Sequence, residues 1–168
     1  MTSKSKKAAS GIIEMVIMIG LVIAITAIVW GVVNGIIGTQ VKSTESCFGN
    51  FGKVSFNKQY TCANSAAGEV QFSLALGDLK IDGILVSLSG VSASKSFKID
   101  NSTTFSYIKM YGGSYGGALS LPEKNSGLTY VVDLSGLGVS DATSIKVSPI
   151  ISGNQCEVSD SINELGSC

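Results

Sequence analysis

The chain has 168 residues and a formal net charge of zero, and its 12 basic residues are all lysines. Because arginine is the side chain that binds phosphate and guanine edges in a bidentate manner, its absence argues against nucleic acid as a partner. The absence of histidine excludes His-dependent catalytic triads and the commonest zinc ligand. We therefore expect no enzyme, no metal site and no other cofactor.

Residues 12–37 are apolar at nearly every position and contain no proline. The part from residue 15 to residue 33 carries no charge, and at ~1.5 Å per helical residue it can cross a hydrocarbon layer of ~30 Å. A segment in lipid must satisfy its backbone hydrogen bonds internally. The pattern therefore predicts a membrane-spanning helix.

The residues before this segment are polar and basic, with Lys4, Lys6 and Lys7 among them. Under the positive-inside rule this end stays in the cytoplasm, and the carboxyl-terminal part is exported. The run from Lys6 to Glu14 (KKAASGIIE), followed at once by the apolar segment, resembles the class III signal peptide of type IV pilins, above all the archaeal ones. The resemblance extends to about residue 40.

The resemblance implies that a prepilin-type peptidase removes the basic leader and leaves the apolar segment in the mature chain. The family rule of a basic residue, then Gly or Ala, then the cut places cleavage after Ala8, with Lys7 before it and Ala9 as the new amino terminus. A cut after Ala9 would make Glu14 the fifth mature residue, where many pilins carry a glutamate. The implied domains are a leader (1–8), an assembly helix and neck (9–46), and an exported head (47–168).

Glu14 is the single charged residue inside the apolar segment. A carboxylate at such a position is costly and usually has a functional partner. The resemblance implies that it pairs with the free amino terminus of a neighbouring subunit inside a filament. The alternative is a position at interface depth near the helix start, where the helix dipole favours a negative charge.

Small and aromatic residues of the same segment predict contacts between helices. Gly31 and Gly35 form a Gly-x-x-x-Gly motif, and Gly20 is a further narrow point, so helices can approach closely there. Glycine is also frequent in ordinary membrane helices, which is the alternative interpretation. Trp30 suits either an anchor at the membrane interface or packing in a bundle.

After a polar neck at residues 40–46, short apolar runs alternate with Gly, Ser, Asn and Asp. Residues 69–76 show the clearest period of two, with Val70 and Phe72 between Glu69 and Gln71. The expected strands are residues 53–56, 69–76, 80–88, 96–100, 104–110, 118–121, 128–134 and 143–151. The predicted fold class is α+β, a long amino-terminal hydrophobic helix followed by an antiparallel β-sandwich of immunoglobulin-like or jelly-roll-like form.

Four cysteines beyond a membrane-crossing segment indicate an oxidising compartment and one or two disulfides. Loop closure favours the pairs Cys47–Cys62 and Cys156–Cys168, each of which would contribute ~3 kcal/mol. The two other connectivities remain open. The wide spacing and the lack of histidine argue against a metal site.

Three other signals lie in the expected head. Asn101-Ser102-Thr103 is a glycosylation sequon between two expected strands. The loop Tyr111–Gly117, with four glycines and two tyrosines, is interpreted as a mobile hairpin tip or as a contact for another subunit or a surface ligand. The acidic tail predicts a solvated surface rather than a calcium site, because it lacks EF-hand spacing; its members are Asp141, Glu157, Asp160 and Glu164.

The sequence thus predicts a structural subunit of an extracellular type IV pilus-like filament for adhesion or surface attachment. Its partners would be other copies of itself, the peptidase, the pilus assembly machinery and, before assembly, the cytoplasmic membrane. One alternative is an archaellin, the subunit of a motility filament with the same plan, although Glu14 favours a pilus. The second is an uncleaved single-pass surface binding protein.

Overall fold

The computed structural model describes the backbone of residues 4–168 and the side chains of residues 11–37 and 47–168. The chain divides into two compact units, with the boundary between Ser43 and Thr44. We call the second unit the β domain. The fold class is α+β, as predicted: one long apolar helix precedes two antiparallel sheets.

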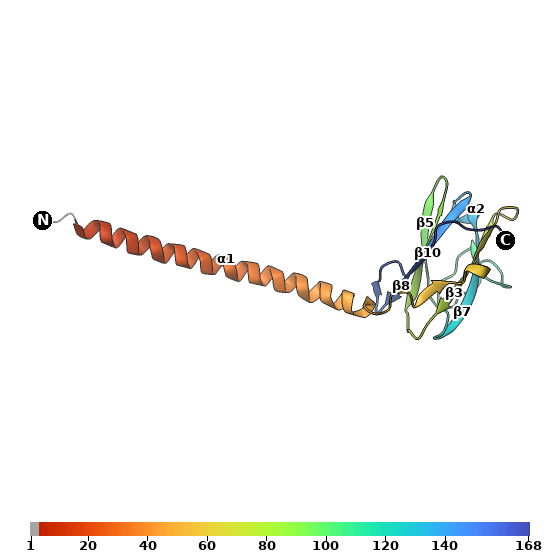
Figure 1. Cartoon of the computed structure of the whole chain (residues 1–168), viewed down its shortest axis with the longest axis horizontal. Coiled ribbons are helices and arrows are strands. Elements are labelled where there is room, and N and C mark those ends of the chain that lie inside the picture. The colour runs from red at the N-terminus through yellow and green to blue at the C-terminus, as the bar shows by residue number, and fades with distance from the viewer. Residues whose placement is uncertain (1–3) are drawn as a thin grey trace. The chain divides into compact units, whose positions relative to one another are not determined.

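Helix α1 spans Lys4–Cys47 (Figure 1), so it contains the whole apolar segment and continues through the polar neck. No proline interrupts this range. The helix ends where the chain turns at Gly49, whose φ of +76° lies in the left-handed region that favours glycine. The backbone N–H of Asn50 donates to the carbonyl of Cys47 at 3.2 Å and closes this turn.

The described strands form two five-stranded antiparallel sheets. The first sheet has the order β1-β3-β7-β6, with β2 also beside β3; its strands are β1 (Val54–Phe56), β2 (Cys62–Asn64), β3 (Glu69–Leu76), β6 (Ile108–Met110) and β7 (Ser126–Asp133). The second has the order β10-β8-β4-β5, with β9 beside β8; its strands are β4 (Gly83–Gly90), β5 (Ser94–Ile99), β8 (Ala142–Ile151), β9 (Asn154–Gln155) and β10 (Asp160–Ile162). Two short helices complete the domain, the 3₁₀ helix η1 (Lys58–Tyr60) and α2 (Leu134–Leu137).

This strand order is that of an immunoglobulin-like sandwich. With β1 and β2 together as strand A, the first sheet follows the order A-B-E-D. The second sheet follows G-F-C, and β5 is an additional strand beside C. Of the two forms that the sequence predicted, the strand order supports the immunoglobulin-like one.

The apolar core lies between the two sheets. Phe72 of β3 stacks on Tyr130 of β7 with ring centroids 5.3 Å apart, and its ring lies 6.4 Å from that of Phe97 in the second sheet. The Tyr130 hydroxyl donates to the Ser120 carbonyl at 2.5 Å. Burial raises the pKa of this phenol, so it remains a neutral hydrogen-bond donor. Each large side chain buried here contributes about 1.5–3 kcal/mol, so the β domain has a core of its own.

Most of the expected strands are present. The prediction for residues 69–76 matches β3 at both ends, and with displaced boundaries residues 53–56, 80–88, 96–100, 128–134 and 143–151 correspond to β1, β4, β5, β7 and β8. The prediction for residues 104–110 is only partly right, because β6 begins at Ile108. Residues 118–121 form no strand; Ala118 makes an isolated bridge to Thr104. The short strands β2, β9 and β10 escape prediction because two or three residues are too few to display an alternating pattern.

The predicted disulfide pairs Cys47–Cys62 and Cys156–Cys168 are wrong. The structure joins Cys47 to Cys156 and Cys62 to Cys168, with sequence separations of 109 and 106 residues. Loop-closure entropy favours near neighbours in a disordered chain, but strand pairing decides which cysteines meet in the folded chain. Cys156 is held beside β8, because its backbone N–H donates to the Pro149 carbonyl at 2.9 Å.

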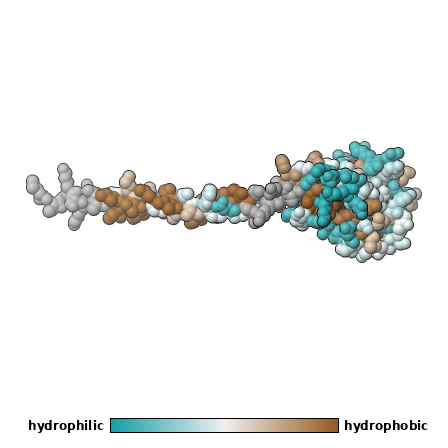
Figure 2. Space-filling view, turned by 90° about the horizontal axis from the view of Figure 1, so that it is seen from below, coloured by the Kyte–Doolittle hydropathy of each residue, from teal (hydrophilic) through white to brown (hydrophobic). Residues whose placement is uncertain are grey.

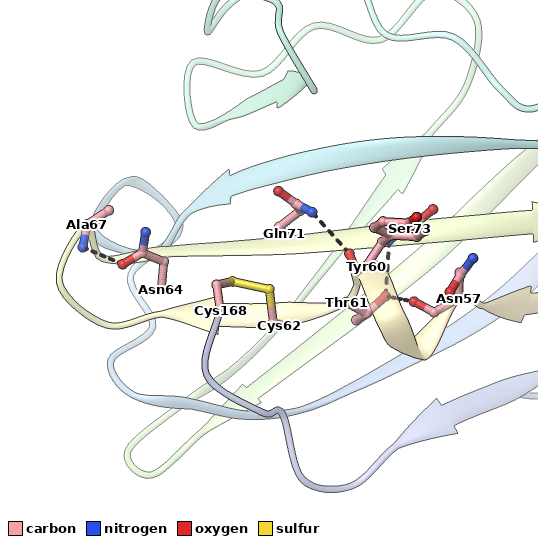
Figure 3. Close-up of a disulfide and its surroundings, with 9 residues drawn as sticks. All are labelled: Asn57, Tyr60, Thr61, Cys62, Asn64, Ala67, Gln71, Ser73 and Cys168. Atoms are coloured by element: carbon pink, nitrogen blue, oxygen red, sulfur yellow. Dashed lines mark hydrogen bonds between the residues drawn. A yellow bond between two sulfur atoms is a disulfide. The ribbon is translucent and has the colours of Figure 1, made fainter.

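The carboxyl-terminal tail reaches Cys62 because it lies alongside β2 (Figure 3). The N–H of Ala63 donates to the Gly166 carbonyl at 2.8 Å, and the N–H of Cys168 donates to the Ala63 carbonyl at 3.1 Å. The tail thereby covers the outer edge of β2, and the Cys62–Cys168 bridge fastens it there. Covering an edge strand in this way prevents unwanted strand pairing.

Side-chain hydrogen bonds also join the two sheets at this edge. Ser159 Oγ donates to the Val54 carbonyl at 2.7 Å and accepts the N–H of Gly52 at 3.1 Å. Asp160 Oδ2 accepts the N–H of Phe56 at 2.8 Å. The acidic residue Asp160 therefore has a structural role, in contrast to the solvated position expected for it.

Candidate functional site

The apolar part of α1, Gly11–Ile37, is long and apolar enough to cross a membrane. Its large side chains are exposed along its whole length, for example Ile12 at 67% and Trp30 at 67% (Figure 2). Taking each such side chain out of water is worth about 1.5–3 kcal/mol, so this surface requires lipid or protein around it. The segment of 27 residues is ~40 Å long, which exceeds a hydrocarbon layer of ~30 Å.

The one hydroxyl of this segment is hydrogen-bonded within the helix. Thr26 Oγ1 donates to the Val22 carbonyl at 2.7 Å, one turn earlier. A hydroxyl bonded in this way adds no unpaired donor when the helix leaves water. Glu14 is the charged residue of this segment, and its side chain is exposed.

Small residues form a continuous stripe along α1. At ~100° per residue, Gly20, Ala24, Ala27, Gly31 and Gly35 lie within a sector about 80° wide. A Cβ atom built on Gly20, Gly31 or Gly35 would meet nothing within 4 Å, so the chain itself does not fill this surface. The predicted Gly31–Gly35 motif and the narrow point at Gly20 thus belong to one face, and Ala24 and Ala27 are further members that lie outside the Gly-x-x-x-Gly pattern.

Glu14 lies on a different face of α1. It precedes Gly20 by six residues, which places it about 120° around the helix axis from Gly20 and about 100° from the middle of the small-residue stripe. The carboxylate and the middle of the stripe therefore lie on different sides of the helix.

The expected cleavage site lies in the first turns of α1. The backbone of Lys7, Ala8 and Ala9 is helical, and their side chains lie outside the described residues. At the opposite end, the last residue of α1, Cys47, belongs to the β domain and is bonded there to Cys156, directly after β9.

Asn101 of the sequon lies two residues after the end of β5 and is exposed. Its Oδ1 accepts the N–H of Leu121 at 2.8 Å, while its Nδ2, the atom that carries a glycan, donates to none of the described residues. Thr103 and Ser102 donate to the carboxylate of Asp100 and hold its pKa well below the usual range, Thr103 having the larger effect. The sequon is thus in an ordered turn with its amide nitrogen accessible, and its occupancy stays a prediction.

The glycine-rich loop Tyr111–Gly117 is not a hairpin tip, because β7 begins only at Ser126. Its turns are closed by backbone hydrogen bonds, including Gly113 N–H to the Met110 carbonyl at 2.8 Å and Gly116 N–H to the Phe105 carbonyl at 3.0 Å. The loop brings Tyr115 to the first sheet, where its hydroxyl donates to Glu69 Oε1 at 2.6 Å.

Lys109 completes this cluster. Its Nζ donates to the same Glu69 oxygen at 3.3 Å and lies 4.2 Å from the centroid of the Tyr115 ring. Burial, and secondly the hydrogen bond to Glu69, raise the pKa of Tyr115, so the phenol remains protonated. Sequence reasoning missed this group because its members come from β3, β6 and the loop, which are distant in the chain.

Among the side chains that the structure describes, no three His, Cys, Asp or Glu residues come together in a way that can hold a metal ion. All four cysteines are in disulfides.

Comparison with protein-family models, characterised proteins and solved structures found no match for this chain. The long apolar helix and the disulfide-bonded β domain indicate a membrane or extracytoplasmic protein. This architecture is consistent with that of a pilin.

Proposed function

We propose that this protein is a structural subunit of an extracellular filament of the type IV pilus kind, which serves adhesion or surface attachment. The observation that carries the proposal is the Gly11–Ile37 surface of α1, which is exposed along its length, long enough to span a membrane and marked by a stripe of small residues. It suits first a lipid environment and then a bundle of identical helices. The protein turns over no substrate in this proposal.

The transfer from lipid to bundle needs a driving force other than hydrophobicity, because lipid tails are as apolar as the helix. Close packing at the stripe of Gly20, Gly31 and Gly35 supplies van der Waals contacts. Glu14 supplies a second force when a neighbour's amino terminus neutralises it inside the low-dielectric bundle. Because these features lie on different faces, each subunit contacts several others, as a helical, non-closing assembly requires.

Maturation precedes assembly in this scheme. The precursor lies in the cytoplasmic membrane with Lys4, Lys6 and Lys7 on the cytoplasmic side. A prepilin-type peptidase cuts beside Ala8 and creates the amino group that later pairs with Glu14 of a neighbouring subunit. The assembly machinery then extracts the subunit. The β domain, braced by the Cys47–Cys156 and Cys62–Cys168 bridges, coats the filament and faces the environment.

Electron microscopy of surface filaments tests the proposal. Cells that produce the wild-type chain are expected to carry filaments that contain it. Gly31→Leu, which fills the small-residue stripe, is expected to reduce filament yield about tenfold or more while the precursor still inserts in the membrane. Val29→Leu, on the opposite side of the helix, is the matched control and should assemble normally. A wild-type chain that never leaves the membrane would overturn the proposal.

A further inference from the structure

We propose that the outer surface of the first sheet carries a binding groove for a neutral saccharide. The groove has a volume of about 300 Å³ and is lined by side chains from β2, β3, β6 and β7 and by the loop after β6. This inference concerns the β domain of a single subunit, so it goes beyond the filament proposal and does not depend on it.

The floor of the groove follows from strand register. Gln71 of β3 pairs with Val131 of β7, which pairs in turn with Lys109 of β6. Their neighbours Val70 and Val132 are fully buried in the core, so these three point to the opposite, outer side of the sheet. Val131 is an apolar residue on this outer side, yet it is only 6% exposed, because it lies at the bottom of the groove.

One wall is a fixed polar group. Glu69 Oε1 accepts hydrogen bonds from the Tyr115 hydroxyl at 2.6 Å and from Lys109 Nζ at 3.3 Å. Glu69 Oε2 accepts none from the described residues, and the Lys109 ammonium has further protons to donate. Since the two charges neutralise each other, this wall offers a hydrogen-bond acceptor and a donor without net charge.

Two carboxamides on neighbouring strands, Asn64 of β2 and Gln71 of β3, also line the groove, beside the Cys62–Cys168 bridge (Figure 3). Gln71 Nε2 donates to the Tyr60 carbonyl at 3.3 Å, which orients the side chain and leaves its oxygen for a ligand. Asn64 Oδ1 accepts the N–H of Ala67 at 3.1 Å, which leaves its NH₂ group. Both amides are thus held in place before a ligand arrives.

Tyr111 at the rim supplies an aromatic surface. Its side chain is 69% exposed although it is large and mostly apolar, and it stands beside Gly112 and Gly113, which leave the approach to the ring open. A tyrosine provides contact area at low entropic cost and can stack on an apolar ligand surface.

These features together select the ligand class. The lining is too polar for a wholly apolar ligand, and the internal neutralisation of Glu69 by Lys109 disfavours a strongly charged one. A pyranose sugar combines an apolar ring surface, which fits Tyr111, with hydroxyls that both donate and accept, which fit the carboxamides and the carboxylate. The volume corresponds to the lower end for small-molecule sites, so one or two sugar units of a longer glycan occupy it.

Saturation-transfer NMR on the full chain in lipid nanodiscs tests the inference without any glycoside detergent. The probes are the neutral disaccharides lactose, mannobiose, maltose and chitobiose, with sialyllactose and choline as charged probes. At least one neutral disaccharide is expected to receive magnetisation, and to receive it more strongly than either charged probe. Tyr111→Ala and Gln71→Ala are each expected to weaken that binding about tenfold or more.

The matched control is Phe51→Ala, which removes another aromatic side chain, 76% exposed and outside the groove, and should bind as the wild type does. An unchanged melting temperature checks that each variant is folded. Lack of binding by all four neutral disaccharides, binding of a charged probe alone, or binding that survives Tyr111→Ala and Gln71→Ala overturns the inference. None of these outcomes bears on filament formation, because the measurement uses unassembled subunits.

Discussion

Glu14 combines a charge with a position where a charge is expensive, and this makes it the most testable single residue. Glu14→Gln keeps the shape of the side chain and removes the charge. If a neighbour's amino terminus pairs with this carboxylate, the variant leaves that ammonium group unpaired in the bundle at a cost of about 3–5 kcal/mol. We expect filament yield to fall at least about tenfold, measured by electron microscopy and by the amount of sheared filament protein.

Glu123→Gln is the control for Glu14→Gln, because it removes a charge from an exposed position of the β domain. It should assemble normally, and both variants should show the same melting temperature of the β domain as the wild type. Normal filament yield from Glu14→Gln would remove the pairing role and leave Glu14 as a residue at interface depth.

The carboxylate of Asp133 makes the stability of the β domain depend on pH. Its carboxylate caps α2 by accepting the N–H and hydroxyl of Ser135, at 3.0 and 2.8 Å, and the N–H of Gly136 at 3.3 Å. The hydroxyl of Ser135 is the largest cause that lowers the pKa of Asp133 in the folded chain. A lowered folded-state pKa contributes stability above the unfolded-state pKa of about 3.9, and this contribution is lost as the pH falls through the folded-state value.

Asp133→Ala should therefore lower the free energy of unfolding of the β domain by about 1 kcal/mol at neutral pH, because the cap is lost. Asp133→Asn retains a capping oxygen but does not titrate, so its melting temperature should approach that of the wild type as the sample is acidified. A constant difference between Asp133→Asn and the wild type across the acidic range would show that the carboxylate charge is not what stabilises the cap.

At the scale of elements, each disulfide is expected to hold its own segment in place independently of the other. One holds the end of α1, and the other holds the carboxyl-terminal tail. The double variant Cys62→Ser/Cys168→Ser releases the tail from β2, and Cys47→Ser/Cys156→Ser releases the last residue of α1 from the segment after β9. Each pair closes a loop of more than 100 residues, and removal of a bridge typically costs about 2–4 kcal/mol. Both melting temperatures should fall, and only the first variant should lose amide protection at Ala63.

Peptide mapping under non-reducing conditions checks the connectivity directly. It should yield a cross-linked peptide pair that contains Cys47 and Cys156, and a second that contains Cys62 and Cys168. Recovery of a Cys47–Cys62 peptide would contradict the structure and would restore the pairing favoured by loop length.

Elements with a strong local signal were predictable from the sequence, and those made by long-range contacts were not. The helix follows from unbroken apolar composition, and β3 follows from strict alternation, with Val70 and Phe72 inward and Glu69 and Gln71 outward. The disulfide pairs, the short strands and the polar group around Glu69 depend on which strands become neighbours. No local pattern contains that information, because β3 and β6 are separated in the sheet by β7, which comes later in the chain than either.

The candidate assembly surface was more predictable than the candidate groove for the same reason. Gly20, Gly31 and Gly35 lie on one continuous helix, where spacing alone fixes the face they share. Gln71, Val131 and Lys109 form a row only after three strands have paired in one register. A shift of one residue in one of these pairings would place the side chains of the shifted strand on the opposite face of the sheet, so the row would be broken.

At the scale of the whole molecule, the two units meet different requirements. The β domain buries its own core between two sheets and contains two disulfides. The apolar helix buries none of its large side chains within the chain, so its stability depends on what surrounds it. A protein built in this way can exchange one surrounding for another without refolding its exported domain.

That exchange depends on processing, which gives the last prediction. If the helix assembles through a pairing of Glu14 with a neighbour's amino group, that group must be created next to the apolar segment. Mass spectrometry of the chain from purified filaments should therefore show loss of residues 1–8 and an amino terminus at Ala9, or at Ser10 if the cut follows Ala9.

A leader-blocking variant such as Ala8→Leu should accumulate uncleaved in the membrane and form no filaments, whereas Ser3→Ala, farther from the cut, should be processed normally. A filament chain that still begins near Met1 would leave no free amino group for Glu14 and would favour an uncleaved surface binding protein, in which the saccharide groove of the β domain would carry the function.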